Sequence, residues 1–113
     1  MRLVGEAADG LEAIQQAREL HPDLILLDIG LPKLNGIEAA KRIRGVVPGT
    51  KILFLTSNNA ADVVDAALKA GGEGYLLKTD ARCELLPAIE AVARAKHYVS
   101  KGLIDFAPGL AAD

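Results

Sequence analysis

The chain has 113 residues, about the size of one small domain, and carries a formal net charge of −2 at pH 7. Its composition, 50% hydrophobic and 25% charged, is typical of a globular protein. The small net charge gives no reason to expect a nucleic acid or an anionic membrane as a partner. The longest apolar runs are too short to cross a bilayer, and the single cysteine, Cys83, fits a reducing compartment. We therefore expect a cytoplasmic protein.

Strand patterns and helix patterns alternate along the chain. Short apolar runs predict strands, whereas apolar residues three or four positions apart predict helices. The expected strands are residues 2–7, 24–28, 51–56 and 75–78. The expected helices surround the apolar positions at 11–18, 37–47, 63–68 and 81–95, with a modest kink at Pro87 and with Ser57 or Asn59 capping the third. This alternation predicts an α/β fold, a doubly wound parallel sheet of about four strands and four helices.

The last residues of the chain are weakly patterned and contain Pro108-Gly109. We expect residues 1–100 to form the folded domain and residues 101–113 to be a linker or a disordered tail.

Three predicted strands end in polar residues, namely Asp28, Thr56 and Lys78. Because parallel strands end at the same edge of a sheet, these side chains should lie near one another, at the edge where open α/β sheets bind ligands. A carboxylate, a hydroxyl and an ammonium together suit phosphoryl chemistry, with the carboxylate as nucleophile. Each residue also has a simpler interpretation, as a helix cap, a strand residue or a solvated lysine, so the pattern alone leaves the function open.

Three separated motifs resemble those of one known family. They are Asp28-x-x-x-Pro32-x-x-x-Gly36, Leu55-Thr56-Ser57 and Ala70-Gly71-x-x-Gly74-Tyr75-x-x-Lys78. In this order and spacing they resemble the receiver domain of bacterial two-component response regulators, which has a flavodoxin-like fold. The phrases VGEAADGLEAI and GYLLK resemble the LuxR-type (NarL/FixJ-like) subfamily, and the likeness extends over about residues 3–100.

The resemblance implies a role for each matching residue. Asp28 would be the phosphoacceptor for a sensor histidine kinase, and Lys78 would pair with the phosphate. Thr56 would be the switch hydroxyl, and Tyr75 would be the switch aromatic that turns inward with it. Mg²⁺ would be the expected cofactor, held by Asp28 and by the backbone carbonyl of Gly30.

The sequence departs from the family pattern at its start. The family opens with a strand that ends in two acidic residues, followed by a helix, but no such pair precedes Asp28 here. The metal site is thus expected to be incomplete, and the first strand and helix to be absent. Three outcomes are open: the strand at residues 3–7 moves in beside residues 24–28, two chains pair, or the sequence is a shortened product or has a misassigned start. We expect a homodimer with rearranged or domain-swapped pairing.

The leading functional hypothesis is a phosphorelay signalling module that is not itself an enzyme. In a full-length parent it would control a DNA-binding transcriptional domain, whereas this chain itself should not bind DNA. The alternative is a degenerate receiver that dimerises or docks without phosphorylation. A flavodoxin-like cofactor enzyme is disfavoured, because Ala7-Ala8-Asp9-Gly10 offers no phosphate-binding loop.

Overall fold

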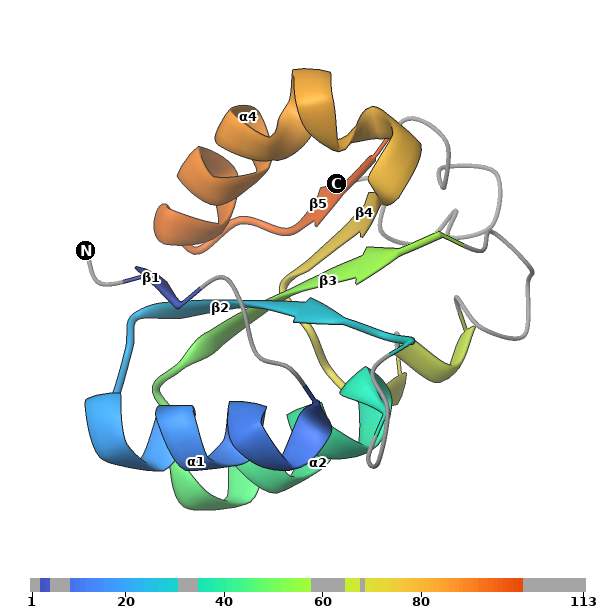
Figure 1. Ribbon diagram of the computed structural model, residues 1–113. Coiled ribbons are helices and arrows are strands. Elements are labelled where there is room, and N and C mark those ends of the chain that lie inside the picture. The colour runs from blue at the N-terminus through green and yellow to red at the C-terminus, as the bar shows by residue number, and fades with distance from the viewer. Residues whose placement is uncertain (1–2, 5–8, 31–34, 58–64, 68, 101–113) are drawn as a thin grey trace.

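The computed structural model describes residues 3–4, 9–30, 35–57, 65–67 and 69–100 (Figure 1). The elements in chain order are β1 (Leu3–Val4), α1 (Gly10–Leu20), β2 (Leu24–Asp28), α2 (Gly36–Val46), β3 (Lys51–Thr56), β4 (Gly74–Leu77), the 3-10 turn η1 (Lys78–Asp80), α4 (Ala81–Ala93) and β5 (Tyr98–Val99). The expected Asn59 cap, most of the third expected helix and the expected tail at 101–113 lie outside the described residues.

All five strands are parallel, and they lie in the order β1-β2-β3-β4-β5. The central pair is β2 with β3, in which Asp28 lies opposite Leu55. The expected α/β sheet is confirmed. The structure adds β5, two residues that pair with β4, to the four expected strands. No strand was expected at β5, because two residues are too few to show a strand pattern.

The first strand, β1, lies directly beside β2, with Leu3 opposite Leu24 and Val4 opposite Ile25. This is the first of the three outcomes considered from the sequence, in which the early strand moves in beside residues 24–28. The strand was expected over residues 2–7, but β1 contains two residues, and residues 5–8 lie outside the described part.

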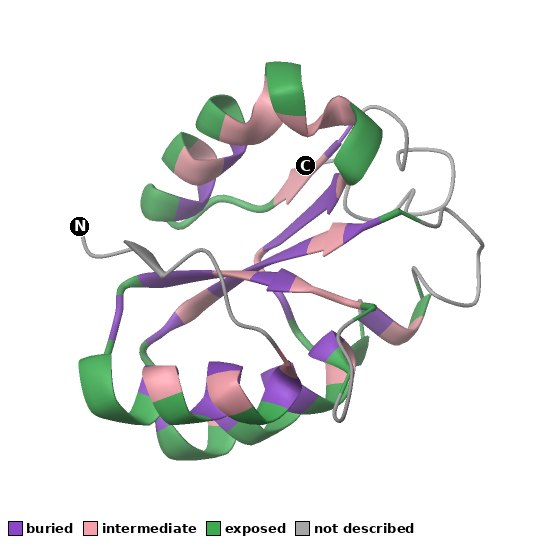
Figure 2. Ribbon diagram, viewed as in Figure 1, coloured by how far each residue is buried: buried purple, intermediate pink, exposed green. Residues whose placement is uncertain are grey.

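Helices cover the two faces of the sheet unequally. Figure 1 shows α1 and α2 together below the sheet and α4 above it. Apolar residues alternate between these faces along β3. Ile52 and Phe54 lie in the core between the sheet and α1 and α2, whereas Leu53 lies in the core between the sheet and α4. Figure 2 shows β2, β3 and β4 largely buried and the outer sides of the helices largely exposed.

Side-chain caps fix where the first two helices begin. Asp9 accepts a hydrogen bond from the Glu12 amide at 2.8 Å, and Asn35 accepts one from the Glu38 amide at 2.9 Å. Each cap satisfies an amide that has no partner within its helix. The last helix ends at Ala93, two residues earlier than expected, because the chain turns there through Ala95, whose φ of 62° lies in the left-handed region.

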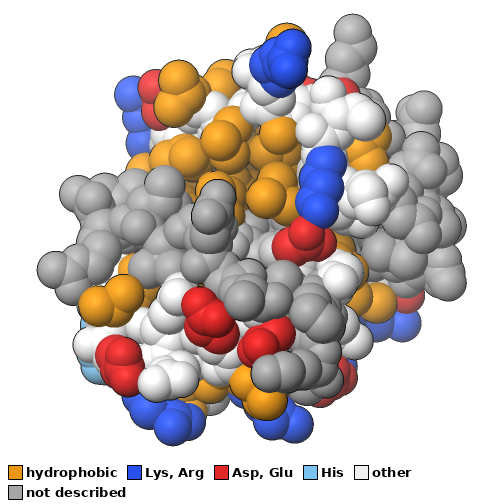
Figure 3. Space-filling model, viewed as in Figure 1, with side chains coloured by type: hydrophobic (Ala, Val, Ile, Leu, Met, Phe, Trp, Pro, Cys, Tyr) orange, Lys and Arg blue, Asp and Glu red, His pale blue; other side chains and the backbone are white. Residues whose placement is uncertain are grey.

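The sheet face that bears α4 is incompletely covered by the described residues. Figure 3 shows hydrophobic side chains gathered on this face of the molecule. Leu26, Leu55, Leu85 and Ile89 all pack against the α4-side core, and each remains only partly buried. No helix within the described part is long and apolar enough to span a membrane.

Candidate functional site

Asp28 is the last residue of β2, at the carboxyl edge of the sheet, as the sequence predicts. Its Oδ1 accepts a hydrogen bond from the Gly30 amide at 2.8 Å, and its Oδ2 forms an ion pair with Nζ of Lys78. The Asp28 side chain is 32% exposed and that of Lys78 is 44% exposed. The carboxylate is therefore held in place but remains open to a reactant from solution.

Lys78 reaches Asp28 because two separate chain segments end at the same edge. It is the first residue of η1, directly after β4 ends at Leu77, rather than the last residue of the strand. Fifty positions separate Lys78 from its partner in the sequence, yet the sheet brings their side chains into direct contact. This contact shows that two of the three polar residues, Asp28 and Lys78, lie together as expected.

Gly36 lets α2 begin close behind the end of β2. The Gly36 amide donates to the Ile29 carbonyl at 3.0 Å. A Cβ atom at Gly36 would lie 2.8 Å from the carbonyl carbon of Asp28, and nearer still to the oxygen. No side chain larger than hydrogen fits here without moving the backbone that carries Asp28.

Thr56 is the last residue of β3, the strand between β2 and β4. It is buried, at 5% exposure, and lies opposite Leu77 in the register with β4. Its strand neighbour Leu55 lies opposite Asp28, and the Leu55 carbonyl accepts a hydrogen bond from the Ile29 amide at 2.9 Å. The third polar strand end is thus at the expected edge, next to the strand that ends in Asp28.

Tyr75 does not point its hydroxyl at Asp28. Its ring stacks on Phe54, with centroids 5.8 Å apart, and its hydroxyl donates to the Gly72 carbonyl at 2.7 Å. The side chain is only 4% exposed, and this burial is the main reason that the pKa of Tyr75 is raised from 10.0 to about 12. The Glu73 carboxylate raises the pKa further, whereas Arg44 opposes the rise.

The described residues do not form a complete magnesium site. Asp28 has both carboxylate oxygens engaged, one by the Gly30 amide and one by Lys78. Within the described part of the chain, no three His, Cys, Asp or Glu side chains are placed to hold a metal ion together. Because Mg²⁺ prefers several oxygen ligands, one carboxylate and one carbonyl fall short of what it needs.

Residues 1–90 match the family model described as Response regulator receiver domain. The chain belongs to this family. The LuxR-type resemblance of the receiver is confirmed by its similarity to transcriptional regulators and to a LuxR-family structure. The chain is 44% identical over 96 residues to the uncharacterised transcriptional regulatory protein YxjL of Bacillus subtilis (strain 168), and the match covers 85% of this chain and 44% of YxjL.

Two further proteins support the same assignment of the receiver. The nitrate/nitrite response regulator protein NarL of Escherichia coli (strain K12) is 41% identical over 102 residues, covering 89% of this chain and 47% of NarL. A two-component response regulator of the LuxR family from Aurantimonas sp. SI85-9A1 superposes with a TM-score of 0.85 and 33% identity, over 97% of this chain and 79% of that one. The chain spans about half the length of the curated relatives that it matches.

The receiver also contains polar residues that sequence reasoning did not select. Arg44 on α2 and Glu73 before β4 form an ion pair in which both side chains are about three-quarters buried. The turn at Gly71-Gly72-Glu73-Gly74 was recognised from its glycines, but nothing in the helical pattern of α2 marks Arg44 as its partner. Only the fold brings the two together.

Proposed function

We propose that this receiver accepts a phosphoryl group on Asp28 from the phosphohistidine of a sensor histidine kinase. The proposal rests chiefly on the contact of the Asp28 carboxylate with the Lys78 ammonium at an exposed sheet edge. An ammonium beside the carboxylate lowers the repulsion that a negatively charged phosphoryl donor would otherwise meet there.

The chemistry requires only groups that this proposal names. A carboxylate oxygen of Asp28 attacks the phosphorus of a phosphohistidine whose other ring nitrogen is protonated. A P–O bond forms, the P–N bond breaks with its electron pair staying on the ring nitrogen, and the products are an acyl phosphate and a neutral histidine. Lys78 then pairs with an oxygen of the new phosphoryl group, which carries the greater negative charge. The Gly30 amide, which contacts Oδ1 of Asp28, keeps the carboxylate oriented during the attack.

The proposal gives Thr56 and Tyr75 the roles that the family resemblance implies. Thr56 moves to donate its hydroxyl hydrogen to a phosphoryl oxygen, and Tyr75 is the aromatic residue that turns inward with Thr56. The position of Thr56 at the end of β3, next to the strand that ends in Asp28, supports its part. The support for Tyr75 is its inward position on the same sheet face as Thr56 and Phe54.

In a full-length parent, the receiver controls a DNA-binding transcriptional domain in the cytoplasm and is not itself an enzyme; the similarity to NarL and YxjL supports this. A magnesium requirement is part of the proposal on family grounds alone. We also propose a homodimer in which a second copy covers the α4-side sheet face, because partly buried leucines such as Leu26 and Leu55 remain in contact with water there.

The direct test is phosphorylation of the purified chain by acetyl phosphate with millimolar magnesium, read by intact mass. We expect one phosphoryl group to be added, and none to be added to the Asp28→Asn variant. Asp23→Asn is the matched control, because Asp23 is an exposed aspartate at the opposite end of β2. A chain that gains no phosphoryl group, or that gains it equally in Asp28→Asn, would refute the phosphoacceptor role.

A second candidate function is a docking module that works without phosphorylation. It is favoured by the lack of a three-ligand metal cluster among the described residues. Light scattering separates the two candidates: a phosphorylation-independent module dimerises equally with and without acetyl phosphate, and also as Asp28→Asn. Loss of the dimer in Leu55→Glu, with helix content unchanged, would assign the dimer contact to the α4-side face.

A further inference from the structure

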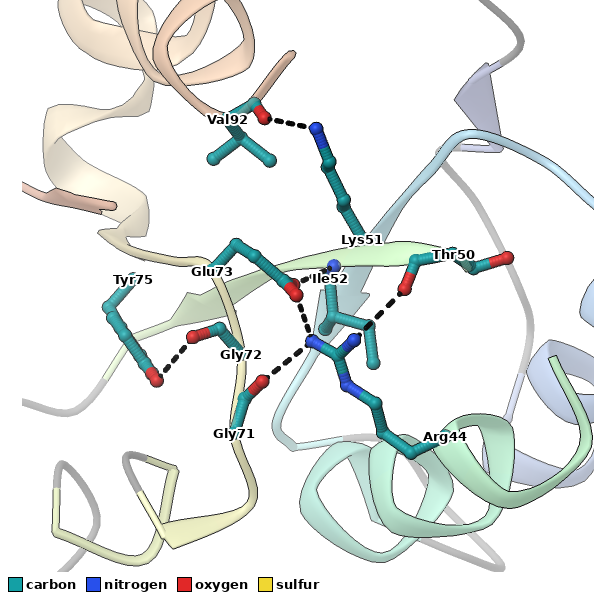
Figure 4. Close-up of polar contacts among 9 residues, drawn as sticks. All are labelled: Arg44, Thr50, Lys51, Ile52, Gly71, Gly72, Glu73, Tyr75 and Val92. Carbon is teal, nitrogen blue, oxygen red and sulfur yellow. Dashed lines mark hydrogen bonds and ion pairs between the residues drawn. The ribbon is translucent and has the colours of Figure 1, made fainter. Parts of the chain in front are cut away.

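Arg44 of α2 joins segments that lie far apart in the sequence (Figure 4). Its guanidinium donates to the Thr50 carbonyl at 3.3 Å and to the Gly71 carbonyl at 2.6 Å, and forms an ion pair with the Glu73 carboxylate. The second Glu73 oxygen accepts a hydrogen bond from the Ile52 amide at 2.7 Å. The turn before β4 is therefore tied to α2 on one side and to β3 on the other.

Gly72, between Gly71 and Glu73 in the same turn, accepts a hydrogen bond from the Tyr75 hydroxyl. Figure 4 shows the Tyr75 hydroxyl directed at the Gly72 carbonyl, which lies between the two residues that Arg44 contacts. A Cβ at Gly72 would lie 2.6 Å from the ring of Phe54, on which Tyr75 stacks. The turn and the two rings fit so closely that a shift of the turn must move the acceptor of the Tyr75 hydroxyl.

We propose that Arg44 is a positioning residue for Tyr75: it fixes the turn whose Gly72 carbonyl keeps the Tyr75 ring inside the protein. The inference rests on the proposed function, in which Tyr75 is the aromatic residue that responds to phosphorylation of Asp28. With Arg44 in place, Tyr75 is already inward before any phosphoryl group arrives. Phosphorylation then stabilises a position that α2 has set, rather than creating it.

The chain offers both a clean reporter and a matched control. It contains two tyrosines and no tryptophan, so a Tyr98→Phe background leaves Tyr75 as the only fluorescent tyrosine. Arg42 lies on the same helix, is exposed, and makes no hydrogen bond or ion pair with a described residue. Arg42→Gln therefore removes the same charge from α2 without touching the turn.

The experiment measures acrylamide quenching of Tyr75 fluorescence in this background, without a phosphoryl donor. We expect Arg44→Gln to shift the inward–outward equilibrium of the ring by about tenfold, which corresponds to about 1.4 kcal/mol, and to raise quenching accordingly. Arg42→Gln should leave quenching unchanged. Arg44→Lys keeps the positive charge but loses the several N–H donors of the guanidinium, so it should give Tyr75 quenching between that of the parent and that of Arg44→Gln. This variant replaces Arg44→Gln in the test if Arg44→Gln does not fold.

Circular dichroism separates positioning from general loosening. Tyr98 is not an independent reporter, because its backbone amide donates to the Glu73 carbonyl of the same turn at 3.1 Å. The proposal requires Arg44→Gln to keep the helix content of the parent while Tyr75 quenching rises. Loss of helix content together with Tyr75 exposure would reduce Arg44 to a structural role, and unchanged Tyr75 quenching in both Arg44 variants would overturn the inference.

Adding acetyl phosphate with magnesium distinguishes this inference from the proposed function. When Asp28 is phosphorylated, we expect Tyr75 in Arg44→Gln to return toward the low quenching of the parent. If Asp28 gains no phosphoryl group, the proposed function fails, whereas the quenching difference without donor still decides the role of Arg44. Phosphorylation that leaves Tyr75 of Arg44→Gln exposed would refute the link between the two.

Discussion

Gly36→Ala tests how closely α2 and β2 must approach at the phosphoacceptor. The added methyl would lie 2.8 Å from the Asp28 carbonyl carbon and 2.9 Å from the Ile29 Cα, and backbone atoms cannot rotate away as a side chain can. Overpacking of this kind costs about 1–3 kcal/mol. With a urea dependence of about 1–3 kcal/mol per M, the unfolding midpoint should fall by roughly 1 M. Phosphorylation by acetyl phosphate should also slow, because the strand end that carries Asp28 must shift.

Gly45→Ala is the matched control for this prediction. Gly45 lies in the same helix, and a Cβ there would meet no atom within 4 Å. Alanine in place of glycine inside a helix stabilises it by about 0.5–1 kcal/mol, so the two variants should shift the urea midpoint in opposite directions. If Gly36→Ala is as stable as the parent, or is stabilised like Gly45→Ala, the close approach does not constrain this site.

Three further predictions concern stability. Thr50→Val removes a buried hydroxyl that donates to the Pro22 carbonyl at 2.8 Å, and should lower the free energy of unfolding in urea by about 1–3 kcal/mol. Asp9→Ala removes the cap on the Glu12 amide and should cost about 0.5–2 kcal/mol, whereas Asp9→Asn, which can still cap, should cost little. Because the pKa of Tyr75 is raised to about 12 in the folded protein, the folded state retains this proton more strongly than the unfolded state. Its contribution to stability is complete below pH 10 and is lost as the pH rises toward 12; urea titrations should find a weaker loss in Tyr75→Phe.

The sequence predicted most strongly those elements with long, regular patterns. The apolar run at Leu24–Asp28 is bounded by turn residues, and the structure has β2 with these same bounds. The position of Asp28 at the carboxyl edge followed from that run, and its contact with Lys78 followed from the rule that parallel strands end together. Both features depend on local pattern and on general topology, which a single sequence carries.

Features that depend on packing between distant segments were not predictable. The inward position of Tyr75 depends on Phe54 and on the Gly72 carbonyl, and the place of that carbonyl depends on Arg44. None of these contacts follows a helix or strand period. The two residues of β5 were missed for a different reason, because a strand of that length has no period to detect.

Among the described residues, α4 is the single helix on its face of the sheet, and this placement has a consequence for chirality. The strands progress across the sheet in sequence order, yet α4 lies on the opposite face from α1 and α2. The crossover from β4 to β5 must therefore have the opposite hand to the crossovers from β1 to β2 and from β2 to β3. Crossovers between parallel strands are right-handed in about 98% of cases, because strand twist favours that hand. A sheet with crossovers of both hands therefore contains one of the rare hand. β5 lies at the edge of the sheet and has only two residues, so an unfavourable twist there strains few residues.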